Sequence, residues 1–171
     1  MMRLNIIFIG FMGSGKSSIG RHLAQELNMN FVDIDELIQK HVGMSVREIF
    51  TQKGESFFRV QEQNLSKKFG SQSNLVISTG GGIVLNQDTM KFLLKKGFAI
   101  YLECDFDTIV QRITAEDTRP LFNLEELPKF KQLFEFRKQF YEKYAKFTID
   151  VGPKSINLVI SEILQYLKKE N

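Results

Sequence analysis

One octapeptide near the N-terminus restricts the fold of this chain more than any other feature. Residues 10–17 read Gly-Phe-Met-Gly-Ser-Gly-Lys-Ser, which matches the pattern G-x-x-x-x-G-K-[ST] of phosphate-binding loops at every fixed position. The apolar run at residues 5–9 is typical of a buried parallel strand. Residues 18–27 carry apolar side chains at 19, 23, 24 and 27, the spacing of an amphipathic helix. Strand, glycine loop and helix in this order predict an α/β fold that binds a phosphate at the loop.

The loop predicts how that phosphate is held. Its glycines allow backbone angles that bring successive N–H groups to face a phosphate, and the following helix adds unpaired N–H groups and the positive end of its dipole. We expect Lys16 to reach the β- and γ-phosphates of a nucleotide and the Ser17 hydroxyl to bind Mg²⁺. A chance match in a glycine-rich turn is the alternative, which the flanking strand and helix disfavour.

Composition excludes several classes of protein. The chain has 171 residues, enough for a single domain, with 43% hydrophobic and 25% charged residues as in ordinary globular proteins. The net charge of +3 comes from scattered basic residues, so we expect no nucleic-acid-binding face. We find no apolar run long enough to span a membrane and no secretory signal. The single cysteine, Cys104, ends an apolar run and is expected in the core; a cytoplasmic location is the default.

The rest of the chain alternates between strand-like and helical patterns. Apolar runs recur at residues 5–9, 31–34, 75–78, 98–102 and 147–149, and a closing amphipathic helix is expected over 155–169. This alternation predicts a five-stranded parallel sheet between helices in one domain, residues 1–171.

Two regions interrupt the alternation. Residues 35–70 hold too much helix for one crossover, and Gly43 and Ser45 are expected to end one helix and cap the next, so a helical insertion is predicted at about 35–62. The polar stretch from Thr114, broken by Pro120, predicts a lid at about 114–124.

Further candidate site residues follow the second and third strands. Asp33 and Asp35 come at the carboxyl end of the second strand, where alternation would place both on one face, suited to Mg²⁺ or a substrate hydroxyl. Asp35 has an alternative reading as a helix N-cap. The glycines at 80, 81 and 82 follow the third strand and favour a loop that approaches a ligand closely, although a flexible turn is the simpler reading.

Three arginines are candidates for gripping anions. Arg59 and Arg137 lie among aromatic residues on predicted helices, where a guanidinium can bind a carboxylate with two hydrogen bonds. Spacing alone favours a surface arginine at each, with Glu62 as the partner of Arg59. Arg119 precedes Pro120 in the predicted lid and either closes on the transferred phosphate or is a solvated loop charge.

Together these motifs resemble one family, the shikimate kinases, over essentially the whole chain. The resemblance rests on residues 10–17, Phe-Val-Asp-Ile-Asp at 31–35, Glu-Ser-Phe-Phe-Arg-Val-Gln-Glu at 55–62, Ser-Thr-Gly-Gly-Gly-Ile at 78–83, Arg-Pro-Leu at 119–121 and Arg-Lys-Gln-Phe-Tyr at 137–141. It implies a three-layer P-loop fold with a five-stranded parallel sheet, a substrate-binding insertion and a lid. It also implies transfer of phosphate from ATP to the 3-hydroxyl of shikimate, in aromatic amino-acid biosynthesis, by a cytoplasmic monomer.

The resemblance also implies roles for individual residues. The phosphates of ATP would be bound by Gly13, Ser14, Gly15, Lys16, Ser17 and Ser18, with Arg119 reaching phosphate from the lid and Arg112 stacking on adenine. Mg²⁺ would be held by Ser17 and, through water, by Asp33. Shikimate would be bound by Asp35, Arg59, Gly80, Gly81, Gly82 and Arg137, with Asp35 positioned to take a proton. Lys16, Asp35 and Arg119 would be the catalytic residues. The turn at 152–154 departs from the family, and Lys154 is only a loose match to its usual arginine.

Three alternatives to this function differ in testable ways. A gluconate-like hydroxy acid is the next candidate acceptor, and a nucleoside monophosphate would require a base-reading site that residues 35–62 do not offer. A nucleotide-dependent switch or motor would need an Asn-Lys-x-Asp run, which is absent, or an apolar strand ending in Asp beside the loop strand, whereas the strand at 75–78 continues into Thr79-Gly80.

Overall fold

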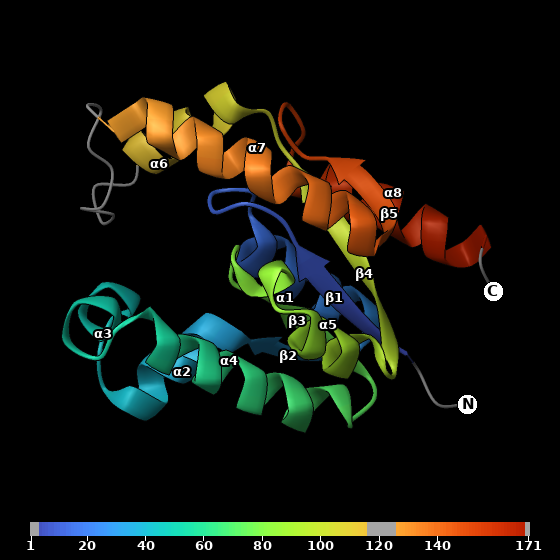
Figure 1. Ribbon diagram of the computed structural model, residues 1–171. Helices are drawn as coiled ribbons and strands as arrows, with labels where there is room; N and C mark the ends of the chain where they lie inside the picture. The colour runs from blue at the N-terminus through green and yellow to red at the C-terminus, as the bar shows by residue number, and fades with distance from the viewer. Residues whose placement is uncertain (1–3, 116–125, 170–171) are drawn as a thin grey trace.

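Five parallel strands form the centre of the computed structural model, which describes residues 4–115 and 126–169 (Figure 1). They are β1 (Asn5–Ile9), β2 (Asn30–Asp33), β3 (Leu75–Ser78), β4 (Gly97–Glu103) and β5 (Ala145–Asp150), in the order β2-β3-β1-β4-β5. Every residue of β1 and β3 is buried, as expected for inner strands of a sheet covered on both faces. The strand order places the predicted phosphate loop after the central strand.

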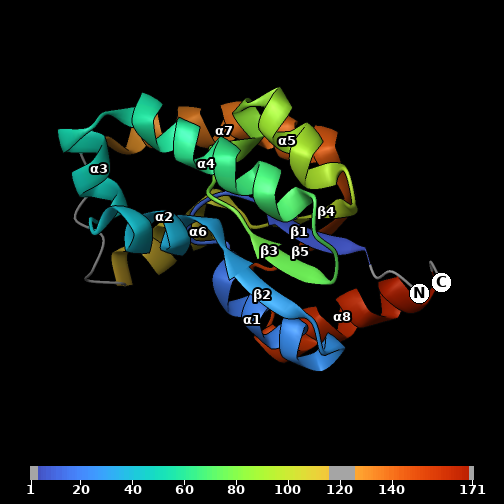
Figure 2. The ribbon, with the colours of Figure 1, turned by 90° about the horizontal axis from the view of Figure 1, so that it is seen from below.

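Helices cover both faces of the sheet (Figure 2). The helices α1 (Lys16–Leu27) and α8 (Ile156–Lys169) lie on one face, and α5 (Gln87–Leu94) and α7 (Leu127–Tyr144) lie on the other. The helix α6 (Phe106–Ala115) follows β4, and the 3₁₀ turn η1 (Ile83–Leu85) follows the triple glycine. Among the described residues, no helix has both the length and the apolar character needed to cross a membrane.

The helical segment between β2 and β3 projects beside the sheet. It contains α2 (Ile34–Val42), α3 (Val46–Gln52) and α4 (Glu55–Gly70), and α4 packs against α2, α3 and α5. Gly43 ends α2 with a positive φ, and Ser45 caps α3 in a capping box with Glu48, so both predicted caps are confirmed. The predicted insertion boundary at residue 62 falls inside α4, which continues to Gly70.

The position predicted for Asp35 is wrong. The strand β2 ends at Asp33, and Asp35 lies in the first turn of α2. The helix N-cap is Asp33, whose Oδ1 accepts a hydrogen bond from the backbone N–H of Glu36. An aspartate satisfies unpaired N–H groups at a helix start. The strand therefore ends at Asp33, two residues before Asp35, to which strand alternation had been extended.

Two side chains tie the inner strands together at their ends. Asn5 donates to the carbonyl of Gln72 at 3.0 Å and accepts from the backbone N–H of Leu75 at 3.0 Å. At the carboxyl end, the Thr79 hydroxyl donates to the carbonyl of Phe8 at 2.8 Å, next to the register pair Phe8 and Ser78. The loops that leave β1 and β3 therefore start from a fixed separation. Cys104 is buried, as expected.

Candidate active site

A cavity of about 540 Å³ opens over the octapeptide. Its lining comprises residues 12–19, Gly81, Arg112, Lys154, Ile156 and Val159. Gly13 and Gly15 have φ values of 79° and 86°, a left-handed conformation that side chains disfavour. Gly15 is the N-cap of α1; no side chain of the described residues caps this helix end, and its first turn has no acidic residue. The helix start therefore offers N–H groups to an anion.

Lys16 lies under this loop with 8% of its surface exposed. Its ammonium group donates to the carbonyl oxygens of Gly10 at 2.9 Å and Phe11 at 2.8 Å, and it lies 3.4 Å from the Ser14 hydroxyl. The loop thus keeps a buried positive charge beside the cavity, where it is screened less than at the surface.

Arg112 also lines the cavity. Its guanidinium donates to the carbonyls of Val151 at 2.8 Å, Gly152 at 2.9 Å and Gly13 at 3.3 Å. Lys154 also lines the cavity and pairs with Glu162 at 2.7 Å. Both residues are thus held at the wall, and the adenine contact expected of Arg112 stays a prediction.

Ser17 and Asp33 form the hydroxyl and carboxylate pair expected for magnesium. The Ser17 hydroxyl donates to Oδ2 of Asp33 at 2.6 Å and lies 3.3 Å from the Ser78 hydroxyl. Mg²⁺ prefers oxygen ligands and is usually held by one or two carboxylates together with water and substrate phosphates. No cluster of three or more metal-binding acidic, histidine or cysteine side chains occurs in the parts of the chain that the structure describes. The pair therefore fits a magnesium ion that is shared with a nucleotide.

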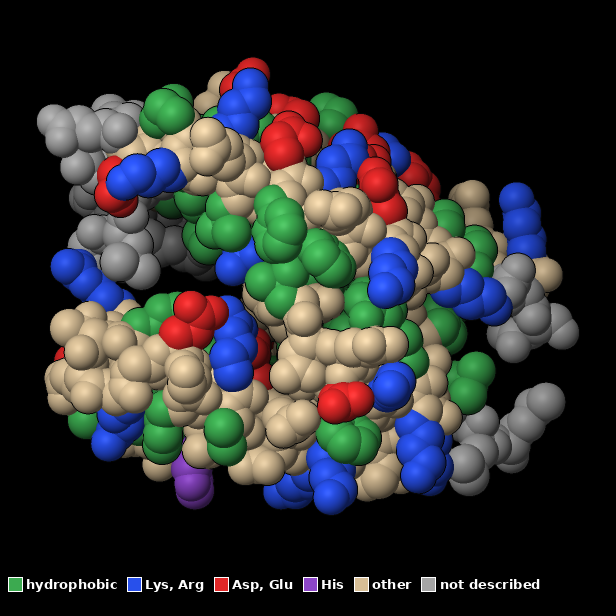
Figure 3. Space-filling view, viewed as in Figure 1, with side chains coloured by type: hydrophobic (Ala, Val, Ile, Leu, Met, Phe, Trp, Pro, Cys, Tyr) green, Lys and Arg blue, Asp and Glu red, His purple; other side chains and the backbone are tan. Residues whose placement is uncertain are grey.

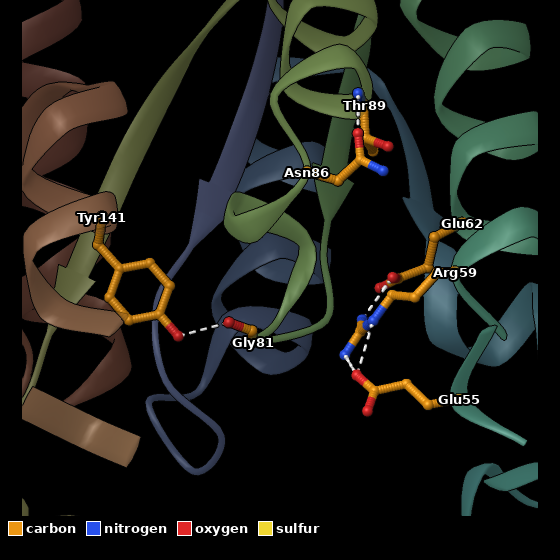
Figure 4. Close-up of polar contacts among 7 residues, drawn as sticks. All are labelled: Glu55, Arg59, Glu62, Gly81, Asn86, Thr89 and Tyr141. Carbon is orange, nitrogen blue, oxygen red and sulfur yellow. Dashed lines mark hydrogen bonds and ion pairs between the residues drawn. The ribbon is translucent and has the colours of Figure 1, made fainter. Parts of the chain in front are cut away.

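The second half of the site surrounds the triple glycine (Figure 4). A side chain on Gly80 would begin 2.7 Å from Oδ1 of Asp35 and 3.0 Å from Oε1 of Glu62, so both carboxylates lie against this glycine. A side chain on Gly82 would collide with the guanidinium of Arg59. The glycines thus let charged groups from α2 and α4 approach the loop backbone, and the close approach to a ligand stays a prediction.

Arg59 is held by two carboxylates of its own helix. Its Nη1 donates to Glu62 at 2.5 Å, while Nε and Nη2 donate to Oε1 of Glu55 at 3.0 Å and 2.7 Å (Figure 4). The Glu55 side chain is 61% exposed, whereas that of Glu62 is 2% exposed. An exposed ion pair contributes little free energy and is readily exchanged. The two Arg59 donors that Glu55 holds, Nε and Nη2, are therefore available to an incoming carboxylate.

Arg137 lies in the core of the site, on α7. It is 9% exposed, and its Nε has no hydrogen-bond partner among the residues that the structure describes. Burial lowers its pKa and outweighs the opposite effect of Tyr141, and the positive charge of Arg59 adds to the lowering. Its guanidinium carbon lies 5.9 Å from the ring centre of Phe11, a residue of the phosphate loop. A buried guanidinium with an unsatisfied donor is a ready site for an anion.

The hollow between these two halves is visible on the molecular surface (Figure 3). The surface is hollowed between the part built from α6 and α7 and the part built from α2, α3 and α4, and basic side chains are exposed there. Asp35 and Arg59 lie against the triple glycine, and Gly81 and Arg137 each lie beside residues of the phosphate loop. Arg119 and most of the predicted lid lie outside the described residues.

Glu62 carries the most perturbed carboxyl group of the site. Burial raises its pKa to about 7, Arg59 acts in the opposite direction, and the negative charge of Asp35 adds to the rise. Burial lowers the pKa of the Arg59 guanidinium, but its ion pairs with Glu62 and Glu55 together outweigh burial, so that pKa is raised. The ion pair between Arg59 and Glu62 would by itself lower the pKa of Glu62. The pKa of Glu62 is nevertheless raised because burial of this enclosed carboxylate outweighs the ion pair.

This perturbation predicts how stability depends on pH. The folded protein binds the Glu62 proton more tightly than the unfolded chain does, so the contribution of Glu62 is full below its ordinary pKa of 4.5 and is lost as pH rises to about 7. Between pH 5 and pH 8 the free energy of unfolding of the native protein should therefore fall by about 2 kcal/mol more than that of Glu62→Gln. Denaturant unfolding at several pH values measures this difference.

A matched control is Glu26→Gln, which changes an exposed carboxylate of α1. Its pH profile should follow that of the native protein. Parallel profiles for the native protein and Glu62→Gln would show that Glu62 does not titrate in this range.

Sequence reasoning missed two residues of the site. Glu62 entered only as a surface partner of Arg59, yet it is buried beside Asp35 and Gly80. Tyr141 ends the motif at 137–141 but was assigned no role of its own, yet its hydroxyl donates to the carbonyl of Gly81 at 2.6 Å. The (i, i+4) spacing from Arg137 is the sequence signal that places Tyr141 on the same helix face.

Known proteins resemble this chain over nearly its full length. The family model described as shikimate kinase matches residues 12–168. The shikimate kinase of Sulfurihydrogenibium sp. (strain YO3AOP1) is 42% identical over 165 residues, which cover 96% of this chain and 98% of that protein.

Solved structures give the same result. Shikimate kinase from Acinetobacter baumannii, in complex with shikimate, has a TM-score of 0.91 at 31% identity and covers 99% of this chain and 95% of its own. Shikimate kinase from Aquifex aeolicus has a TM-score of 0.82 at 36% identity and covers 98% of both chains. The predicted α/β architecture with a five-stranded parallel sheet is therefore confirmed.

Proposed function

The chain belongs to the shikimate kinase family, and from this premise we propose how its residues transfer phosphate from ATP to the 3-hydroxyl of shikimate. The enzyme uses ATP with Mg²⁺ and serves aromatic amino-acid biosynthesis. We infer the role of each residue from the geometry of the two halves of the site.

The loop of residues 13–18 binds the phosphates of ATP. Backbone N–H groups at the start of α1 face them, and Lys16 leaves the carbonyls of Gly10 and Phe11 to neutralise charge near the γ-phosphate. Arg112 borders the adenine end of the cavity. A phosphate role for Arg119 in a lid remains a prediction.

Ser17 and Asp33 would hold Mg²⁺, Ser17 directly and Asp33 through water. The metal ion, when bound, neutralises phosphate charge that develops during transfer. Their hydrogen bond of 2.6 Å keeps the two oxygen groups together beside the phosphate loop.

Arg59, Arg137 and the glycines at 80–82 bind the carboxylate of shikimate, and Asp35 receives the hydrogen bond of its 3-hydroxyl. During transfer, the 3-oxygen forms a bond to the γ-phosphorus while the bond from that phosphorus to the β–γ bridging oxygen breaks, and ADP leaves. The hydroxyl proton passes to Asp35 and then to solvent. The protein contributes mainly by positioning both substrates and stabilising charge.

One observation supports the acceptor assignment above the others. The guanidinium of Arg137 is buried with an Nε that has no partner among the described residues, and Tyr141, one turn further along α7, donates to Gly81 of the glycine loop against which Arg59 lies. Two guanidinium groups around backbone N–H groups match the planar carboxylate of a small acid. A nucleoside monophosphate would have to be recognised through its base, for which no residue in α2–α4 was identified.

The experiment that tests the function is a coupled assay of ADP release with ATP and Mg²⁺. Shikimate should support turnover, whereas gluconate, AMP and buffer alone should give at most a small fraction of that rate. Equal ADP release without any acceptor would instead indicate a switch-type ATPase, and a preference for gluconate or AMP would reassign the acceptor.

The partners proposed are ATP and shikimate, with no nucleic acid or membrane. A monomeric state and a cytoplasmic location are proposed on the same family basis, and gel filtration with light scattering tests the first of these.

A further inference from the structure

Tyr141 is a buried phenol that joins the two halves of the site. It lies on α7 with 1% of its surface exposed, and its hydroxyl donates to the carbonyl oxygen of Gly81 at 2.6 Å (Figure 4). Its ring stacks on that of Tyr101, with centres 5.1 Å apart and planes 28° apart. A tyrosine has few rotatable bonds, so stacking on a strand residue fixes where the hydroxyl lies.

The bond from Tyr141 fixes the orientation of one peptide in the glycine loop. In a trans peptide the C=O and the next N–H point in opposite directions, so holding the Gly81 carbonyl toward α7 directs the Gly82 N–H away from α7. In Figure 4 the Arg59 cluster lies on the other side of Gly81 from Tyr141. The Gly82 N–H is thereby directed to the side on which Arg59 lies.

The same phenol also interacts with Arg137. The two residues are four apart on α7, and the guanidinium lowers the pKa of the phenol against the larger rise caused by burial. The hydroxyl proton is donated to Gly81, so toward a neighbouring cation the phenol oxygen can act only as an acceptor. Gly81 itself lies against the phosphate loop, since a side chain there would be 3.4 Å from the Met12 nitrogen and 3.5 Å from the Gly10 carbonyl.

We propose that Tyr141, one helical turn from Arg137, is a positioning residue for the acceptor: its phenol holds the Gly81–Gly82 peptide in the orientation that binds one carboxylate. This inference rests on the proposed function. It assigns Tyr141 no contact with the reacting atoms, so its effect should fall on acceptor binding and leave phosphoryl transfer itself nearly unchanged.

The variant Tyr141→Phe tests the proposal because it removes only the hydroxyl oxygen. We expect KM for shikimate to rise about tenfold, the effect typical of losing one hydrogen bond to a group that orients a charge. The kcat value and KM for ATP should each stay within about twofold of the native enzyme. The matched control is Tyr101→Phe, which removes a hydroxyl from the other ring of the same stacked pair and should leave KM for shikimate within about twofold.

The proposal would be overturned by an unchanged KM for shikimate in Tyr141→Phe, or by equal changes in both tyrosine variants. A joint loss of kcat and of ATP affinity in Tyr141→Phe would likewise indicate a merely structural role. If the native enzyme releases no ADP in response to shikimate, the proposed function itself fails. If the native enzyme is active and Tyr141→Phe behaves in the same way, only the role of Tyr141 fails.

A second measurement needs no variant and so does not depend on folding of a mutant. Hydrogen exchange of the native protein should show slower exchange at the Gly82 amide when shikimate is added. Unchanged exchange at Gly82 in a protein that binds shikimate would overturn the peptide orientation from which the proposal is built.

Discussion

Replacing Lys16 with alanine should lower kcat about 10³-fold while the protein stays folded. The ammonium group lies under the phosphate loop at 2.9 Å and 2.8 Å from two loop carbonyls, where it can turn toward the γ-phosphate. Charge that develops on phosphate during transfer is stabilised strongly by a fixed cation in a site that excludes water, so its loss affects the transition state more than the folded state. Steady-state ADP release at saturating shikimate measures the effect.

The matched control is Arg21→Ala, which removes a basic residue from the exposed side of the same helix. Arg21 pairs with Glu36 at the surface, and its loss should leave kcat close to that of the native enzyme. Circular dichroism and thermal unfolding establish that both variants are folded. Near-normal turnover by Lys16→Ala would refute the assignment of the loop to ATP.

The second large effect is expected at Arg137. Exchanging it for lysine replaces a planar fork with a point charge, so KM for shikimate should rise about 10- to 100-fold, the range expected for losing a charged hydrogen bond. ATP binding should persist, because the phosphate loop keeps its own backbone donors and Lys16. Titration calorimetry with shikimate and with a non-hydrolysable ATP analogue separates the two affinities.

Lys138→Arg provides the control for this substitution. Lys138 is the next residue on α7 and pairs with Glu103 at 2.9 Å, and the reverse exchange there should change neither affinity by more than about twofold. An equal loss of both affinities in Arg137→Lys would contradict a role confined to the acceptor.

The fold was largely predictable from the sequence because its signals are local. The apolar runs of β1 and β3 match the strands residue for residue, and the glycine and serine at 43 and 45 placed a helix boundary correctly. Strand ends next to helix caps were less predictable. Asp33 can continue a strand or cap a helix, and it caps α2 because it accepts a hydrogen bond from an otherwise unpaired N–H group there.

Site residues that belong to a sequence motif could be predicted, whereas site residues that are placed by tertiary packing could not. Residues 12–19 line the cavity as the octapeptide implied, and the glycines at 80–82 lie at the centre of the acceptor half. The burial of Glu62 depends on how α4 lies beside the glycine loop, and the bond from Tyr141 depends on how α7 lies over β4. Both features depend on how segments far apart in the chain pack together, and local periodicity does not reveal this packing.

The bond between Thr79 and the carbonyl of Phe8 has a consequence for how such an enzyme can change. It joins neighbouring parallel strands at the points where the donor loop and the acceptor loop begin, so the offset between the two substrates is set by backbone spacing, about 4.8 Å per strand. Side chains in α2–α4 can then be exchanged without altering that offset. Exchanges among the side chains of α2, α4 and α7 near the glycine loop can therefore alter which acceptor fits while the spacing between the two loops stays the same.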